Sequence, residues 1–191
     1  MSDTQTTTQT TTQTATTWQI DPAHTQVEFT VKHMMFSRVR GRFEKVDGSL
    51  RFDPDGDLGD AGVRVTIGAA SIDTGQKDRD EHLRSADFLA AEEYPELTFE
   101  STSVDAGRDD EFTVAGDLTI RGVTRQVELD ARLSGVATDP WGNERVAFSA
   151  STTIDRRDFD LTWNQALETG GVLVGHEVKV SIELQATLSE D

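Results

Sequence analysis

The chain has 191 residues, enough for one domain with its own core, and it has no cysteine, which excludes disulfides and thiolate metal sites. Its 35 acidic and 18 basic residues give a formal net charge of −17. Such a surface repels phosphate backbones and anionic membranes, so we expect no nucleic-acid partner. The acidity is also typical of a halophilic protein, in which high salt screens the repulsion, although an ordinary acidic surface is the alternative.

The first residues, 1–17, are rich in Thr and Gln and offer almost nothing apolar to bury. This composition predicts a disordered tail. The segment lacks the basic and apolar regions of an export signal, and no apolar run reaches the roughly 20 residues of a membrane helix. We therefore expect a cytoplasmic protein without stable membrane insertion. Residues 18–188 would form one domain and 189–191 a short C-terminal tail.

From Trp18 onward, apolar and polar residues alternate with a period of two, which is typical of strands with one buried face. About eight strands follow from this alternation and from the Gly, Asp and Pro turns between them. Long antiparallel strands of this kind either stack as two sheets or close into a barrel. The long alternation at 178–188 favours the barrel, which with eight strands can just hold side chains or a small ligand. A sandwich is the alternative. The expected strands are 25–34, 46–52, 63–68, 97–104, 111–120, 124–136, 145–154 and 178–188.

Strand parity also assigns the residues that face the interior. In the first long strand these are Val27, Phe29, Val31, His33 and Met35. In later strands the candidates for contact with a ligand are Leu118, Ile120, Leu129, Phe148 and Ile182. Small residues on the same faces favour a hollow barrel, unless bulky neighbours fill it: Gly116, Ala131, Ala150 and Ala186.

One segment between these strands has a different character. Helix-forming residues run from Asp78 to Ser85, Asp87 can cap a second helical turn, and Pro95 ends the element. The large apolar residues that this insert can bury are Leu83, Phe88 and Leu89. We interpret the insert as a lid over one end of the barrel; an ordinary surface connection is the alternative.

Five segments also resemble one known family, in the order in which that family has them. They read WQIDPAHTQVEFTVKHMMFSRVRGRF, ASIDTGQKDRDEHLRSADF, YPELTFES, GDLTIRGVTRQVEL and DRRDFDLTWNQALETGGVLVGHEV. Over Trp18–Leu188 the chain resembles the YceI-like family of lipid- and polyisoprenoid-binding proteins. The resemblance implies an extended lipocalin-like antiparallel barrel whose interior takes a long isoprenoid chain, with the helical insert as part of the fold and a homodimer as a reasonable assembly. One departure is Asp160, where the family usually has Gly. If that Gly serves a positive φ or close packing, the local turn differs here.

Two polar features are candidates for binding a headgroup. His33 ends its strand on the inward face, where it is either a satisfied core histidine or an anchor at the barrel mouth. Arg38, Arg40 and Arg42 share one face of an extended segment, which suits forked contacts to a diphosphate, although most such rows are solvated and paired with carboxylates. The DRRDF segment, 155–159, is expected to join strands through ion pairs.

No motif for metal binding or catalysis is present. The spacing of His24, His33, His82 and His176 matches neither His-x-His nor His-Glu-x-x-His, and there is no nucleophile elbow or phosphate loop. We therefore assign no metal site, cofactor or catalytic residue.

These observations favour non-catalytic binding, storage or transport of a long-chain apolar lipid. Burial stabilises each CH₂ group by about 0.8 kcal/mol, so a preformed apolar barrel needs few polar contacts to hold a hydrocarbon. The resemblance makes a polyisoprenoid or isoprenoid quinone the expected ligand. Two alternatives are a lipid-modifying enzyme that uses His33 or an inward carboxylate as a base, and a structural or interaction domain with a filled core.

Overall fold

The computed structural model describes residues 16–53, 56, 61–168 and 170–189. It contains one α-helix, α1 (Lys77–Arg84), and two 3₁₀ turns, η2 (Ala69–Ser71) and η3 (Arg156–Phe159), within these ranges. The strands are β1 (Thr17–Ile20), β2 (Gln26–His33), β3 (Ser37–Phe43), β4 (Val46–Arg51), β5 (Gly62–Gly68), β6 (Ile72–Asp73), β7 (Glu96–Ala106), β8 (Glu111–Ile120), β9 (Val123–Thr138), β10 (Glu144–Asp155) and β11 (Val174–Leu188).

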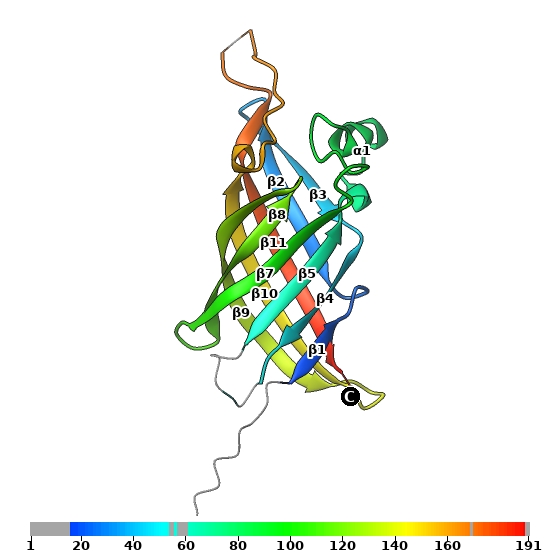
Figure 1. The fold of residues 1–191 in the computed structure, drawn as a ribbon, viewed down its shortest axis with the longest axis vertical. Helices are drawn as coiled ribbons and strands as arrows, with labels where there is room; N and C mark the ends of the chain where they lie inside the picture. The colour runs from blue at the N-terminus through cyan, green and yellow to red at the C-terminus, as the bar shows by residue number, and fades with distance from the viewer. Residues whose placement is uncertain (1–15, 54–55, 57–60, 169, 190–191) are drawn as a thin grey trace, which may run out of the picture.

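The strands form one antiparallel sheet that closes on itself (Figure 1). The closed ring runs β1-β4-β5-β7-β8-β9-β10-β11, and β1 then pairs with β11, where Trp18 lies opposite Leu188. This confirms the predicted eight-stranded antiparallel barrel and rules out the sandwich. Closure leaves no free edge along this ring.

A second pair of strands lengthens the barrel at one end. Beyond the part of β11 that pairs with β1, residues 174–183 pair with β2, and β2 in turn pairs with β3. Figure 1 shows β2 and β3 in the upper half and β1 and β4 in the lower half. The wall thus contains two interrupted strands: β1 and β2 follow one another along β11, and β4 and β3 follow one another on the next position of the wall. The break between β1 and β2 is an Asx turn, in which the amide of Ala23 donates to Asp21 Oδ1 at 3.0 Å.

The insert between β6 and β7 lies beside the upper end of the barrel (Figure 1). Helix α1 is held to the chain before it by the buried Asp80, whose carboxylate accepts from the Thr74 amide at 2.9 Å. The expected second helical turn is wrong, because residues 86–93 form successive turns. Ala90 has a φ of 47°, which a continuing right-handed helix cannot accommodate.

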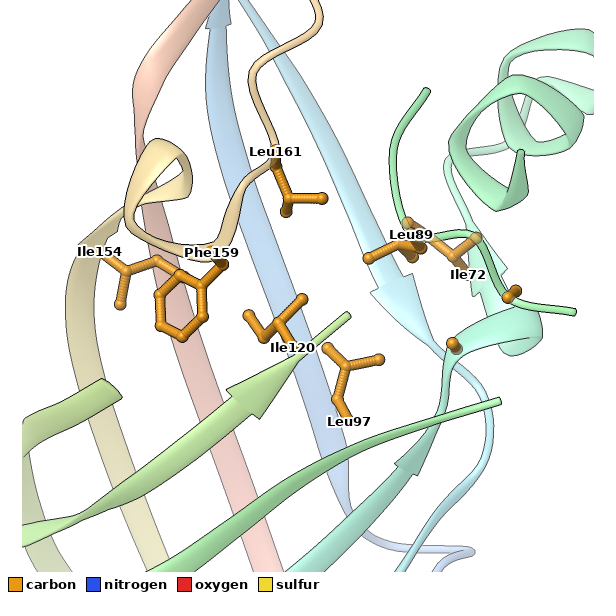
Figure 2. Packing of buried hydrophobic residues seen from close by; sticks show 9 residues of the cluster. Ile72, Leu89, Leu97, Ile120, Ile154, Phe159 and Leu161 are labelled. Carbon is orange, nitrogen blue, oxygen red and sulfur yellow. The ribbon is translucent and has the colours of Figure 1, made fainter. Parts of the chain in front are cut away.

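Two packed clusters lie at opposite ends of the barrel interior. One is built on Trp18, whose indole Nε1 donates to the Phe52 carbonyl at 2.8 Å. The other lies below the insert, and Figure 2 shows its side chains converging from the barrel wall, the insert and the segment after η3. Its buried members are Ala69, Ile72, Leu89, Ala91, Leu97, Ile120, Ile154, Phe159 and Leu161.

The predicted tail boundary needs a correction at its inner end. Residues 1–15 lie outside the described residues, but Thr17 is already the first residue of β1. Thr16 accepts a backbone hydrogen bond from Phe52 at 2.9 Å, and Thr17 accepts one from Ser189 at 3.0 Å. Residues 190–191 lie outside the description as well. Within the described ranges, no helix is long and apolar enough to cross a bilayer.

Candidate functional site

The barrel encloses an elongated cavity of about 300 Å³. Its wall is formed by alternate residues of the strands, and on β11 these extend from Val174 to Leu184. At about 3.3 Å per residue this is roughly 30 Å of strand, which suits an extended chain better than a compact ligand. Apolar side chains make up almost all of the wall, and the polar residues that reach it are Thr25, Arg51, Thr152 and Arg156.

Most of the residues assigned to the interior by parity do line this cavity. They are Val27, Phe29, Val31, Leu118, Ile120, Leu129, Phe148 and Ile182. Met35 does not: it is 57% exposed and has a φ of 68°. Strand β2 ends at His33, so alternation no longer predicts direction two residues later. His33 is half-buried opposite Ser37 and Val174, and it too lies outside the cavity wall.

The small inward residues have different roles. Ala131 and Ala150 line the cavity and are register partners on β9 and β10. Ala186 is fully buried in the cluster around Trp18, and the space beside Gly116 is filled by the ring of Phe99. Ala131 and Ala150 thus border the lumen itself, whereas Gly116 gives the Phe99 ring room against the wall and Ala186 belongs to a packed cluster.

The three apolar residues of the insert all reach the cavity. Phe88 and Leu89 are buried, Leu83 packs against the upper cluster, and each contributes to the wall. A residue missed by the sequence analysis, Trp163, holds the insert in place. Its ring centroid lies 4.7 Å from that of His82 and 5.2 Å from that of Phe88. Trp163 lies in the segment between η3 and β11, where no periodicity signals such a contact.

Arg156, within the DRRDF segment, is a buried charged residue that reaches the cavity wall. It is only 3% exposed, and its guanidinium donates to the backbone carbonyls of Leu161, Val174 and Gly175. Burial lowers the pKa of this guanidinium. The expected ion pairs between strands at DRRDF are wrong: Asp155 pairs with Arg157 within the same turn, and Arg156 joins η3 to β11 through carbonyls.

The arginine row lies on the outside of the barrel. In the β2–β3 register, Val39, Gly41 and Phe43 lie opposite the inward-facing residues of β2. Arg38, Arg40 and Arg42 alternate with them and face solvent, so these three side chains do not line the cavity. Arg42 pairs with Glu44 and with Asp73, each at 3.2 Å.

The histidines of the described residues lie in different parts of the fold. Two histidines make local contacts with a carboxylate, His24 with Asp21 and His82 with Asp87, both at 2.8 Å. His176 lies within β11 rather than in the turn before it, and its buried Nδ1 has no hydrogen-bond partner. Among the described residues, no group of three or more His, Asp or Glu is placed to hold a metal ion.

Comparison with known proteins agrees with this geometry. The model of the YceI-like domain matches residues 18–186. The chain belongs to the YceI-like family. A UPF0312 protein of Staphylococcus aureus is 36% identical over 176 residues, covering 92% of this chain and 99% of the relative. A UPF0312 protein of Pectobacterium atrosepticum is 45% identical over 139 residues, covering 73% and 71%.

Solved YceI-like structures share the barrel. BcnA of Burkholderia cenocepacia superposes with a TM-score of 0.77 at 26% identity, covering 88% of this chain and 99% of that one. The YCEI protein of Campylobacter jejuni gives 0.72 at 32% identity, covering 83% and 90%. A polyisoprenoid-binding domain from Saccharophagus degradans gives 0.64 at 17% identity, covering 90% and 98%; at this identity the likeness concerns the fold.

Proposed function

We propose that this YceI-like protein binds a long-chain apolar lipid inside the barrel and stores or transports it without chemical change. The observation that carries the proposal is the elongated cavity, whose wall is almost wholly apolar. A hydrocarbon in such a cavity leaves water and gains about 25 cal/mol for each Å² of apolar surface buried. A charged or strongly polar ligand would lose its hydration without gaining hydrogen bonds there.

A polyisoprenoid or isoprenoid quinone is the ligand that we favour. The cavity wall extends along β11 from Val174 to Leu184, as a linear prenyl chain requires. The structural neighbour from Saccharophagus degradans is described as a polyisoprenoid-binding domain. The insert residues Leu83, Phe88 and Leu89 would cover the chain at the upper end. A polar headgroup finds few partners in the wall, so we place it near an end of the cavity.

Filling the cavity without changing its polarity tests this proposal. Ala131 and Ala150 are register partners on the wall, and the pair Ala131→Leu and Ala150→Leu adds bulk to the lumen. We expect binding of a fluorescent prenyl probe to weaken at least tenfold while circular dichroism shows a folded barrel. Ser151→Leu is the matched control, because it adds the same side chain on the outer face. Unchanged probe binding by the folded double variant would place the ligand elsewhere.

The enzyme alternative predicts a different outcome. A lipid-modifying enzyme would convert a bound prenyl lipid, so mass spectrometry of the lipid after incubation would detect a new species. A carrier returns the lipid unchanged. Native mass spectrometry of gently purified protein would identify the cargo and the oligomeric state in the same measurement.

A further inference from the structure

The turn between β2 and β3 exposes three consecutive large apolar side chains. Met34, Met35 and Phe36 are 39%, 57% and 82% exposed. Both methionines have a positive φ, 52° and 68°, in a region that Asn and Gly occupy more easily. Neither burial nor backbone conformation therefore accounts for methionine at these two positions.

This turn lies at the same end of the barrel as the insert (Figure 1). The amide of Met34 donates to the Leu173 carbonyl at 2.8 Å, and Met35 packs so close to Gly171 that a β-carbon there would lie 3.1 Å from Met35 Cγ. Leu173 and Gly171 belong to the segment that also carries Trp163, which contacts the insert through His82. The exposed turn is thus tied to the elements that cover the cavity.

Basic side chains lie on the outer face of the strands next to the turn, in contrast to the acidic chain as a whole. Lys32 of β2 and Arg38 of β3 are cross-strand neighbours on the outer face. On the same face, Thr30 of β2 lies between its two register partners, Arg40 of β3 and Lys179 of β11. In the described part of the chain, none of these four cations forms an ion pair or a side-chain hydrogen bond.

Acidic residues also lie on the elements around the turn. Arg42, the next cation along β3, is neutralised by Glu44 and Asp73. The turn contacts Gly171 and Leu173. The acidic side chains nearest to these two in sequence are Glu168, in the segment after η3, and Glu177, two residues before Lys179. The end of the hairpin therefore combines exposed apolar side chains with three cations, Lys32, Arg38 and Arg40, that form no ion pair within the described residues.

We propose that Lys32, Met34, Met35, Phe36, Arg38 and Arg40 form a docking tip that rests on a lipid bilayer with anionic headgroups. The apolar side chains enter the boundary between headgroups and acyl chains, and the cations face lipid phosphates. At an ionic strength of about 0.15 M the Debye length is about 8 Å, so the carboxylates on distant surfaces are screened while the tip makes direct contact. The tip rests on the surface and does not span the bilayer. Docking brings the covered end of the cavity to a membrane from which an apolar ligand can be taken.

The opposite end of the barrel supplies a matched control. Trp141 is 83% exposed at the β9–β10 hairpin, which Figure 1 shows at the lower end. It is flanked by Asp139 and Glu144, and the nearest cation, Arg145, is paired with Asp139 and Asp21. An exposed aromatic ring whose neighbouring cation is already paired with carboxylates is not expected to bind an anionic surface.

Vesicle co-sedimentation tests the proposal with the full chain. Vesicles of phosphatidylglycerol and phosphatidylcholine in equal parts should bind the protein at about 0.15 M salt, and pure phosphatidylcholine vesicles should bind it far less. Each cation near an anionic surface contributes about fivefold to partitioning, so the double variant Arg38→Gln, Arg40→Gln should lose about 25-fold. Phe36→Ser should lose about tenfold or more, because a large apolar side chain is removed from the boundary. Trp141→Ser should bind as the unchanged protein does.

Three results would overturn the proposal. The first is equal binding to both kinds of vesicle. The second is an equal loss of vesicle binding for Trp141→Ser and Phe36→Ser. The third is a Phe36→Ser variant whose free protein has a changed sedimentation coefficient but whose vesicle binding is unchanged. The last result would assign the tip to contact between two copies of the chain. Thermal melting confirms that each variant is folded. Because vesicle binding is measured without a probe in the cavity, failure of the proposed lipid cargo would leave this test unaffected.

Discussion

The ring of Phe29 lies over Gly41 on the neighbouring strand, so close that a β-carbon at Gly41 would come within 2.7 Å of Phe29 Cε1. The two residues are register partners in the β2–β3 pair. A similar relationship recurs at Gly116, where a β-carbon would meet the ring of Phe99. At each glycine, the absence of a β-carbon leaves space for a large aromatic ring to lie against the wall. The ring therefore does not fill the lumen.

Replacing Gly41 with alanine should therefore narrow the cavity. The added methyl group displaces the Phe29 ring, and overpacking of this kind costs about 1–3 kcal/mol of unfolding free energy. We expect weaker prenyl-probe binding together with this loss, measured by fluorescence titration and urea unfolding. Gly135→Ala is the control, because a β-carbon at Gly135 meets nothing within 4 Å. If the Gly41→Ala protein is destabilised but binds the probe with full affinity, the Phe29 ring does not border the bound ligand.

The insert should control how fast a ligand leaves. Leu83→Ser removes an apolar contact from the cavity wall, and Trp163→Ala removes the ring that holds His82 and Phe88. Losing roughly 1.4 kcal/mol of packing at the lid would raise the rate of probe release about tenfold. Release into excess unlabelled lipid measures this rate, with Val136→Ser, an exposed apolar position on β9, as control. If release is unchanged in both lid variants, the insert is only a surface connection.

Asp21 should make a pH-dependent contribution to stability. Arg145 Nη1 donates to Asp21 Oδ2 at 2.7 Å and, helped by His24, lowers the pKa of Asp21 from 3.8 to about 2. Because the folded-state pKa is the lower one, the stabilisation is fully present above about pH 4 and is lost as the pH falls toward 2. Asp21→Asn should cost about 1–2 kcal/mol of unfolding free energy near pH 7.

Urea unfolding at several pH values checks this expectation. The difference between Asp21→Asn and the unchanged protein should shrink steadily below pH 4, since protonation removes the same charge. Asp105→Asn, at an exposed position on β7, should show no such difference. If the difference in unfolding free energy between Asp21→Asn and the unchanged protein stays constant down to about pH 2, the charge of the Asp21 carboxylate does not stabilise the fold.

Asp160 occupies a backbone conformation that glycine adopts more easily. Its φ of 58° and ψ of 20° place it in the left-handed region, where it ends η3. A short polar side chain such as that of Asp160 tolerates this region. Asp160→Gly should raise the unfolding free energy by about 1 kcal/mol, whereas Asp160→Ala should not. Equal stability of the Gly and Ala variants would contradict this account.

Alternation along the sequence was enough to predict most of the barrel wall, because parity holds wherever the backbone stays extended. It failed at Met35, where the chain has already left the strand. The second helical turn of the insert, which was predicted from helix-forming residues and an Asp87 cap, is also wrong, because Ala90 takes a positive φ. The arginine row illustrates a second limit. Parity groups the three arginines on one face, but only the pairing of Phe29 with Gly41 decides that this face is the outer one. Trp163 could not be predicted, because its contacts depend on two segments far apart in the chain.

The short pairing between β3 and β6 has a consequence for self-association. Strand β6 covers β3 only at Arg42 and Phe43, so within the described residues no strand pairs with the outer edge of β3 at 37–41. A free edge of this length is a template for strand addition by another copy of the chain. Here that edge carries Arg38 and Arg40, and two copies aligned along it would bring four guanidinium groups together. Like-charge repulsion between these arginines therefore disfavours strand addition by a second copy at this edge.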